Sequence, residues 1–226
     1  MTNIIPAVMP QNYKDLVEKI EKIPKTLKKV QIDVMDGRFV KSRSWPYNKD
    51  ERGHFEKILM QEEGFPYWED FDFSIDLMVA DPKEEVERWI LAGANEVIIH
   101  IESLKQDGLE YIKNLKEEGV IGIGMAIAPY TPIEELDKYI PYIDLVQFMG
   151  IENVGYQGEP FATRVLGKIK DFREKYTDME VSIDGGVGFD TAKDLVESGV
   201  DTLVSGSVLF NAVNMKETIE RLKDLN

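Results

Sequence analysis

The chain alternates short apolar runs with amphipathic segments along its whole length. Eight runs are rich in β-branched residues and almost continuously apolar, which is typical of strands covered on both faces, as in a parallel sheet. They are residues 4–8, 30–34, 73–78, 97–101, 121–127, 145–149, 181–183 and 202–204. The pattern therefore predicts parallel strands at these eight places.

The segments between the runs have the periodicity of helices. Leu16, Ile20 and Ile23, for example, fall on one helical face. Helix starts are indicated at Asp81-Pro82 and Thr131-Pro132, and helix ends at Gly93, Gly119 and Gly199. Strand then helix, repeated eight times in 226 residues, is the size and order of an α/β protein of the (β/α)8 TIM-barrel type. We expect one domain over residues 1–226, with a doubly wound open sheet as the alternative.

Residues 38–72 interrupt this order as an irregular insertion after strand 2. The connection is longer than usual and rich in Trp, Tyr, Pro and charged residues. A loop of this length in a compact domain is often a lid or an interface element. Part of it, around residues 54–60, could hold the second helix. Its aromatic residues could instead be buried between subunits of a homo-oligomer; they are Trp45, Tyr47, Tyr67 and Trp68.

Carboxylates at the ends of three runs are the first candidates for chemistry, because active sites of such barrels lie at the carboxyl ends of the strands. Asp33, Asp76 and Asp184 have apolar neighbours, among which an unpaired charge is costly. Each alone could be a structural carboxylate satisfied by backbone amides. Three at equivalent ends, with Gln31 two residues before Asp33 and on the same strand face, predict an oxygen-rich cluster.

Glycine-containing loops predict an anion site. Two of them, at residues 184–188 and 205–207, follow a run and open a helical segment, where free backbone N–H groups can bind phosphate without Lys or Arg. Loops after strands seven and eight are the usual phosphate site of a barrel. Together with residues that end other runs, the candidate substrate- and phosphate-binding residues are Gly155, Gly158, Gly185, Gly186, Gly206, Ser207, Met35, Met149 and His100.

Composition narrows the function classes. The 27 basic and 42 acidic residues give a net charge of −15, which argues against nucleic acid or an anionic membrane as partner. The absence of cysteine excludes disulfides, thiolate metal sites and a nucleophilic thiol. Since the sequence shows neither a membrane-spanning run nor a signal-peptide pattern, we expect a cytoplasmic protein. One phosphate held by backbone amides is compatible with the net charge of the protein, because dissolved salt screens charges that lie more than about 8 to 10 Å away.

The motifs resemble the ribulose-phosphate 3-epimerase family in order and spacing. The resemblance rests on Ile-Asp-Val-Met-Asp-Gly at 32–37, Asp-Leu-Met-Val at 76–79, Ile-His-Ile-Glu at 99–102, Ile-Asp-Gly-Gly at 183–186 and Ser-Gly-Ser-Val-Leu-Phe at 205–210. It covers nearly the whole chain outside residues 43–72. The resemblance implies a barrel in which Asp33 and Asp184 act on opposite faces of a pentulose 5-phosphate and invert C3 through an enediolate stabilised by a divalent metal.

The sequence also departs from the pattern of that family. The two metal-ligand histidines are Gln31 and Asp76 here, a substrate-binding serine is Ala7, and a glycine of the phosphate loop is Gln157. Amide and carboxylate ligands in place of imidazoles favour Mg²⁺ or Mn²⁺ over Zn²⁺. The candidate metal ligands are therefore Gln31, Asp33, Asp76 and Asp184, and no organic cofactor is expected.

We therefore expect an epimerase-like isomerase that acts on a pentulose phosphate or a related ketose phosphate. Two alternatives stay open. One is a lyase or decarboxylase of the same superfamily that also passes through an enediolate, since fold does not determine function. The other is a non-catalytic or regulatory sugar-phosphate-binding barrel that has lost its metal site, as Ala7, Gln31, Asp76 and Gln157 would allow.

Overall fold

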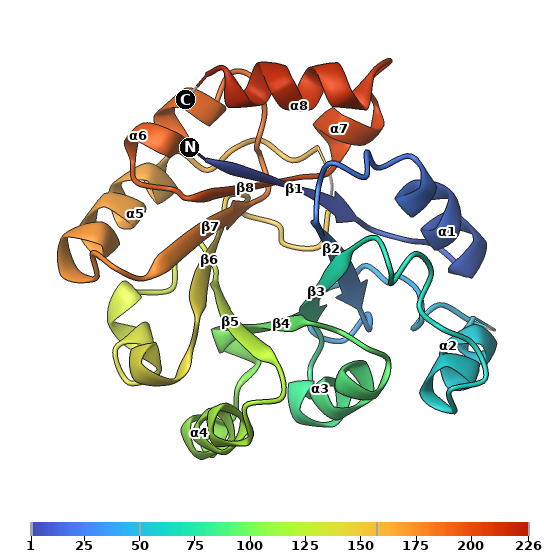
Figure 1. Ribbon diagram of the computed structural model, residues 1–226. Coiled ribbons are helices and arrows are strands. Elements are labelled where there is room, and N and C mark those ends of the chain that lie inside the picture. Colours follow the sequence, from blue (N-terminus) through green and yellow to red (C-terminus); the bar gives the residue numbers. More distant parts are fainter. Residues whose placement is uncertain (1, 50, 157, 226) are drawn as a thin grey trace.

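Eight parallel strands close into one barrel in the computed structural model, which describes residues 2–225 except 50 and 157 (Figure 1). Each strand pairs with the next in the sequence, and β8 pairs with β1. The strands are β1 (Asn3–Val8), β2 (Lys29–Met35), β3 (Asp72–Met78), β4 (Glu96–His100), β5 (Gly122–Ile127), β6 (Leu145–Met149), β7 (Glu180–Asp184) and β8 (Thr202–Ser205). The predicted barrel is confirmed, and the open sheet is wrong.

Helices surround the barrel (Figure 1). They are α1 (Tyr13–Glu21), α2 (Arg52–Leu59), α3 (Pro82–Leu91), α4 (Gly108–Glu118), α5 (Arg164–Lys175), α6 (Ala192–Glu197), α7 (Ser207–Phe210) and α8 (Met215–Lys223). Short 3₁₀ helices are η1 (Ile101–Ser103), η2 (Ile133–Leu136) and η3 (Ile140–Tyr142). None of the described helices is both long and apolar enough to cross a membrane.

The fifth unit departs from the regular repeat. Residues 128–144, between β5 and β6, form η2 and η3 where the pattern predicts a helix after Thr131-Pro132. Pro132 immediately precedes η2, and Pro141 lies inside η3. Proline is tolerated at a helix start, so Pro132 is compatible with the predicted helix, but Pro141 would lie inside a helix that continued from Ile133. Because Pro141 has no N–H to donate and its ring clashes with a preceding helical turn, an α-helix cannot run unbroken to β6, and the segment forms short 3₁₀ turns. The strand predicted at 97–101 also ends one residue early, because Ile101 begins η1.

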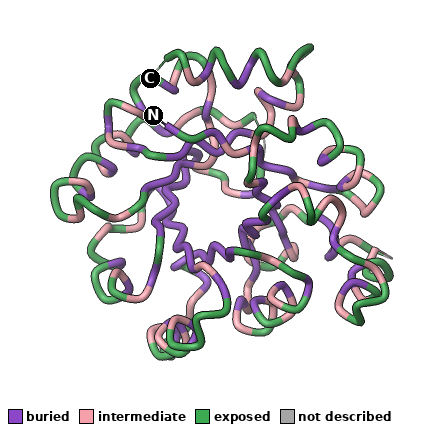
Figure 2. The backbone as a smooth tube through the Cα atoms, in the orientation of Figure 1, coloured by how far each residue is buried: buried purple, intermediate pink, exposed green. Residues whose placement is uncertain are grey.

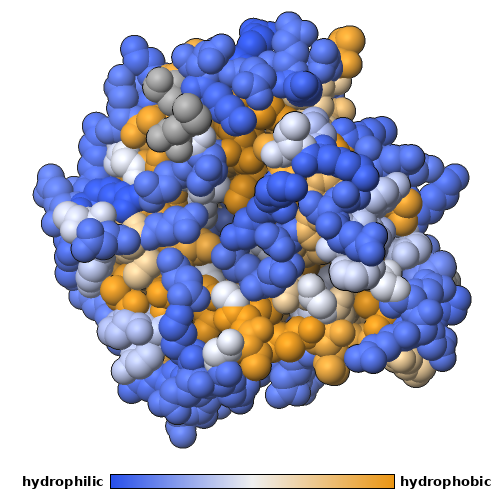
Figure 3. Space-filling view, viewed as in Figure 1, coloured by the Kyte–Doolittle hydropathy of each residue, from blue (hydrophilic) through white to orange (hydrophobic). Residues whose placement is uncertain are grey.

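Two layers of side chains follow from the alternation of each strand. In β2, Val30, Ile32 and Val34 pack in the main core between strands and helices, whereas Gln31 and Asp33 lie on the opposite, inner face. Figure 2 shows the buried ring of strands inside the more exposed helices. On the face shown in Figure 3, hydrophilic residues cover most of the periphery and hydrophobic ones lie closer to the centre. The barrel interior is therefore where polar side chains must satisfy one another.

The insertion at residues 38–72 contributes α2, and near its start the ring centroid of Phe39 lies 5.2 Å from that of His100 at the end of β4. Trp45 is fully buried, with its ring centroid 5.5 Å from that of Phe55 and 6.0 Å from that of Trp89. Ser44 ties the segment to β2, because its Oγ donates to the carbonyl oxygen of Asp33 at 2.8 Å. Trp45 and Tyr47 are buried within the chain itself, so the suggestion that they lie between subunits is wrong for these two.

Candidate active site

Three carboxylates meet inside the barrel near the carboxyl ends of their strands. Asp33 on β2 is directly paired in register with Asp76 on β3, and Asp184 ends β7 on another wall. One ligand atom from each of the three lies within 4.8 Å of the others. Asp33 and Asp76 are buried, and Asp184 is partly exposed. The structure thus brings together the three aspartates that the strand-end pattern singled out.

Gln31 links two of these carboxylates across the barrel. Its Nε2 donates to Oδ1 of Asp33 at 2.9 Å and to Oδ2 of Asp184 at 2.8 Å. The position two residues before Asp33 puts both side chains on the inner face of β2. A single amide group therefore holds the two aspartates at a fixed separation.

Burial raises the pKa values of Asp33 and Asp184. It raises the pKa of Asp184 to about 7, with the charge of Asp76 adding to the effect and the hydrogen bond from Gln31 opposing it. Burial likewise raises the pKa of Asp33 well above its usual value, and the charges of Asp184 and Asp76 raise it further. Near neutral pH the two groups can therefore include both a proton donor and a proton acceptor.

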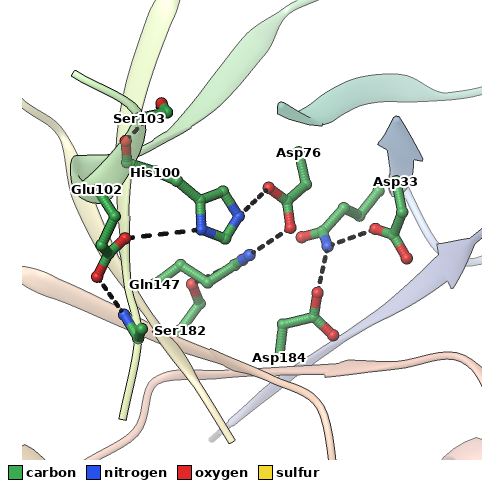
Figure 4. Close-up of polar contacts among 10 residues, drawn as sticks. Asp33, Asp76, His100, Glu102, Ser103, Gln147, Ser182 and Asp184 are labelled. Atoms are coloured by element: carbon green, nitrogen blue, oxygen red, sulfur yellow. Dashed lines mark hydrogen bonds and ion pairs between the residues drawn. The ribbon is translucent and has the colours of Figure 1, made fainter. Parts of the chain in front are cut away.

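Asp76 has a separate set of partners, drawn in Figure 4. The Nε2 atom of His100 lies 3.0 Å from its Oδ1, and Nε2 of Gln147 donates to its Oδ2 at 3.2 Å. Burial lowers the pKa of His100, but the charge of Asp76 and its hydrogen bond outweigh this and raise the pKa above the ordinary value. Ser182 Oγ donates to Oε1 of Gln147 at 3.3 Å.

Gln147 and Ser182 were missed by the sequence interpretation, which considered mainly the residues that end each run. The signal that could have found them is the same one that found Gln31. Each lies two residues before a candidate residue, Gln147 before Met149 and Ser182 before Asp184, and so lies on the same strand face.

A cavity of about 290 Å³ opens beside Asp33 and Asp184. Most of the predicted substrate residues line it, namely Gly155, Gly158, Gly185, Gly186, Gly206, Ser207 and Met149. His100 lines a second cavity of about 540 Å³ instead, and Met35 is fully buried. Tyr156 and Glu159 border both cavities. Gln157, predicted to depart from the family's phosphate loop, lies outside the described residues.

The cavity wall has backbone amides rather than basic side chains to offer an anion. Among the described residues that line the cavity there is no Lys, Arg or His, while Asp33, Asp184, Glu159 and Asp190 are present. Gly186 has a φ of 68° and approaches Phe161 closely, so a side chain there would be strained. An anion in this cavity would therefore depend on uncharged donors, namely the N–H groups of the glycine loops and the hydroxyl groups of lining residues such as Ser207.

The donor set fits a hard divalent cation. Three carboxylates within 4.8 Å of one another provide oxygen ligands, and Gln31 carries an amide oxygen as well as the nitrogen now between Asp33 and Asp184. Mg²⁺ and Mn²⁺ prefer such ligands, whereas Zn²⁺ more often takes nitrogen or sulfur. Gln31, Asp33, Asp76 and Asp184 are thus the residues that could hold the ion.

Lys168 on α5 is a half-buried cation close to the second cavity. Its Nζ donates to the carbonyl oxygen of Ala128 at 2.6 Å, while the N–H of Ala128 donates to Oε1 of Glu102 at 2.8 Å. Burial lowers the pKa of Lys168 to about 8, against the raising effect of Glu102 and Glu134. Lys168 therefore loses its proton at a lower pH in the folded protein than in the unfolded chain.

This shift predicts a pH-dependent contribution to stability. Between pH 8 and the unperturbed lysine pKa of 10.5, the unfolded chain binds more protons at this position than the native protein does. The free energy of unfolding therefore increases as the pH rises through this range. We expect wild type to gain stability relative to Lys168→Met as pH rises from 7.5 to 10, measured by urea unfolding of both. A constant difference between the two proteins would contradict the lowered pKa.

Fold and site together define a (β/α)8 barrel with a buried carboxylate cluster at the carboxyl ends of its strands. Residues 3–210 match the Ribulose-phosphate 3 epimerase family, and the chain belongs to that family. It is 32% identical to ribulose-phosphate 3-epimerase of Eremothecium gossypii, over 86% of this chain and 80% of that protein. It is 27% identical to ribulose-phosphate 3-epimerase of Bacillus subtilis, over 99% of each.

Solved structures share the fold. One is 3-keto-L-gulonate-6-phosphate decarboxylase from Vibrio cholerae, with a TM-score of 0.71, 15% identity and coverage of 99% of this chain and 96% of that chain. Another is KGPDC from Streptococcus mutans, with a TM-score of 0.69, 14% identity and coverage of 100% of this chain and 97% of that chain. At these identities the likeness concerns the fold alone.

Proposed function

We propose that the protein is a ribulose-phosphate 3-epimerase, an isomerase that inverts the carbon next to the carbonyl of a pentulose phosphate or a related ketose phosphate. The observation that carries the proposal is the placement of Asp33 and Asp184. They lie on separate walls of the barrel, joined through Gln31, and both line the cavity that the glycine loops border. Membership of the family and relatives of that name support the same reaction.

Inversion at C3 needs a base on one face of the sugar and an acid on the other. One of the two carboxylates, Asp33 or Asp184, removes the C3 proton, and the other returns a proton to the opposite face of the enediolate. Burial and the charges of neighbouring carboxylates raise the pKa of both groups, which favours one proton shared within the cluster. Gln31, which donates to both, keeps them at the separation that the two proton transfers require.

The remaining residues bind and orient the ligand. The backbone of Gly185, Gly186, Gly206 and Ser207 would hold the phosphate, with Gly155 and Gly158 on the facing loop. Held by Gln31, Asp33, Asp76 and Asp184, a divalent ion such as Mg²⁺ or Mn²⁺ would supply Lewis-acid stabilisation of the enediolate oxygens. Met149 and Met78 offer an apolar floor that excludes water from the reacting carbon.

Proton exchange tests the reaction directly. In deuterated water with Mn²⁺ or Mg²⁺, we expect the purified protein to exchange the C3 proton of ribulose 5-phosphate and to form its C3 epimer, both visible by proton NMR. Tight binding of the sugar phosphate without exchange would overturn the proposal and indicate a non-catalytic barrel. Release of carbon dioxide from a keto acid sugar phosphate without exchange would indicate a decarboxylase.

Gly150 fixes the loop that carries Gly185. Its N–H donates to the carbonyl oxygen of Asp184 at 2.7 Å, and a Cβ at this position would overlap the carbonyl oxygen of Gly185. We expect Gly150→Ala to displace the loop and to lower kcat/KM for ribulose 5-phosphate by about 10²-fold in steady-state assays. Gly167→Ala is the control, because a Cβ there meets nothing within 4 Å. Equal kcat/KM values for the two variants would contradict this role of Gly150.

Several expectations remain predictions. They include assembly into a homo-oligomer and a role of residues 38–72 as a lid or an interface element. So does a cytoplasmic location, with which one relative agrees, the 26% identical protein of Oryza sativa named as a cytoplasmic isoform.

A further inference from the structure

Gln147 is a buried polar residue that the proposed proton transfers do not use. It lies in the middle of β6, where Leu145, Val146, Phe148 and Met149 are all apolar, and its side chain is fully buried. A buried amide is costly unless it is hydrogen-bonded. Its position inside the barrel is therefore explained by the groups it binds.

The two ends of the Gln147 amide have different partners. Nε2 donates to Oδ2 of Asp76 at 3.2 Å, and Oε1 accepts from Ser182 Oγ at 3.3 Å. Because β4 and β5 separate β3 from β6 in the barrel, the bond to Asp76 crosses the interior. The hydroxyl of Ser182, on the neighbouring strand β7, determines which end of the amide faces Asp76.

Asp76 is consequently held on both of its oxygens. His100 approaches Oδ1 at 3.0 Å, and Gln147 binds Oδ2, as the dashed lines in Figure 4 show. Asp33 and Asp184, by contrast, share the single amide of Gln31. The carboxylate of Asp76 therefore has one orientation set from two directions, which suits a fixed ligand better than a group that exchanges protons with a substrate.

We propose that Gln147, with Ser182 behind it, is a positioning residue that orients Asp76 as a ligand of the divalent ion. The inference rests on the proposed function, because it concerns the ion that the reaction would use. A short carboxylate in place of an imidazole reaches its ion in only a few orientations, and Gln147 selects among them. Partners of this kind typically change metal affinity by about 10- to 100-fold when removed.

The test measures Mn²⁺ binding alone, without substrate, by electron paramagnetic resonance of the free ion. We expect Gln147→Leu to raise the Mn²⁺ dissociation constant by about 10- to 100-fold. Ser182→Ala, which keeps the amide but frees its orientation, is expected to raise it by about threefold to tenfold. Ser74→Ala is the matched control, since Ser74 Oγ donates to Oε1 of Glu96 at 2.7 Å, a buried hydroxyl-to-carboxylate bond on the same strand as Asp76.

A double-mutant cycle with Asp76→Asn separates positioning from general damage to the fold. If Gln147 acts through Asp76, Gln147→Leu costs little further affinity once Asp76→Asn is present. Wild-type affinity in Gln147→Leu and Ser182→Ala, or equal losses in the two backgrounds, would overturn the inference. If those results came with normal C3 exchange, the proposed function would stand. Absence of Mn²⁺ binding by wild type would overturn the positioning role and the metal site together.

Discussion

Asp184→Asn is expected to lower kcat for C3 epimerisation by about 10³- to 10⁴-fold while leaving the barrel folded. The asparagine keeps the size of the side chain and a hydrogen-bond acceptor for Gln31, but it can neither remove nor return a proton. Proton exchange at C3 in deuterated water measures the loss, and circular dichroism verifies the fold. Asp33→Asn should give a loss of similar size, because inversion needs both groups.

Asp144→Asn provides the control for this prediction. Asp144 directly precedes β6, at the end of the barrel opposite the cavity, where it accepts from the N–H of Ile123 at 2.9 Å. Its removal is expected to leave kcat within about twofold of wild type. A rate in Asp184→Asn close to that of Asp144→Asn would show that Asp184 is not part of the acid–base pair.

Trp45→Ala is expected to lower the free energy of unfolding by about 3 to 5 kcal/mol. The indole is fully buried and lies in an aromatic cluster with Phe55, Phe65 and Trp89, whose ring centroids are 5.5, 6.2 and 6.0 Å away. Truncation leaves a cavity that these rings can fill only partly. Urea unfolding followed by circular dichroism measures the change.

Trp68→Ala, in the same insertion, is the matched substitution on the surface. The indole of Trp68 is 64% exposed, so its loss is expected to change stability by no more than about 0.5 kcal/mol. If Trp45→Ala cost as little, the insertion would be attached to the barrel by something other than its aromatic cluster.

Most of the fold could be predicted because buried parallel strands have a sequence signature of their own. Runs such as residues 97–101 and 121–127 are almost continuously apolar, and the regular alternation of such runs with helical patterns leaves a barrel as the simplest arrangement. The fifth unit could not be predicted as well. A helix was predicted there from the start signal at Thr131-Pro132, whereas Pro141 prevents a continuous α-helix nine residues further on.

The sequence predicted which residues of single strands face the site, but not which of them contact one another across the barrel. Asp33, Asp76 and Asp184 were found because acidic residues in apolar runs are conspicuous, and Gln31 because it shares a strand face with Asp33. The partnership of Gln147 with Asp76 could not be foreseen. It joins strands that are not neighbours, and its geometry depends on the stagger of the whole barrel.

The bridge made by Gln31 has a consequence for how the protein folds. Gln31 and Asp184 are separated by 153 positions in the sequence, and their strands are connected through β1 and β8, whose pairing closes the ring. Contacts between residues so far apart in the sequence form late in folding, because the chain between them must first lose the conformational entropy of a long loop. Helices and adjacent strand pairs can therefore be present in a chain that has no working site. During refolding, recovery of catalysis would report ring closure, whereas far-ultraviolet circular dichroism would report the earlier local steps.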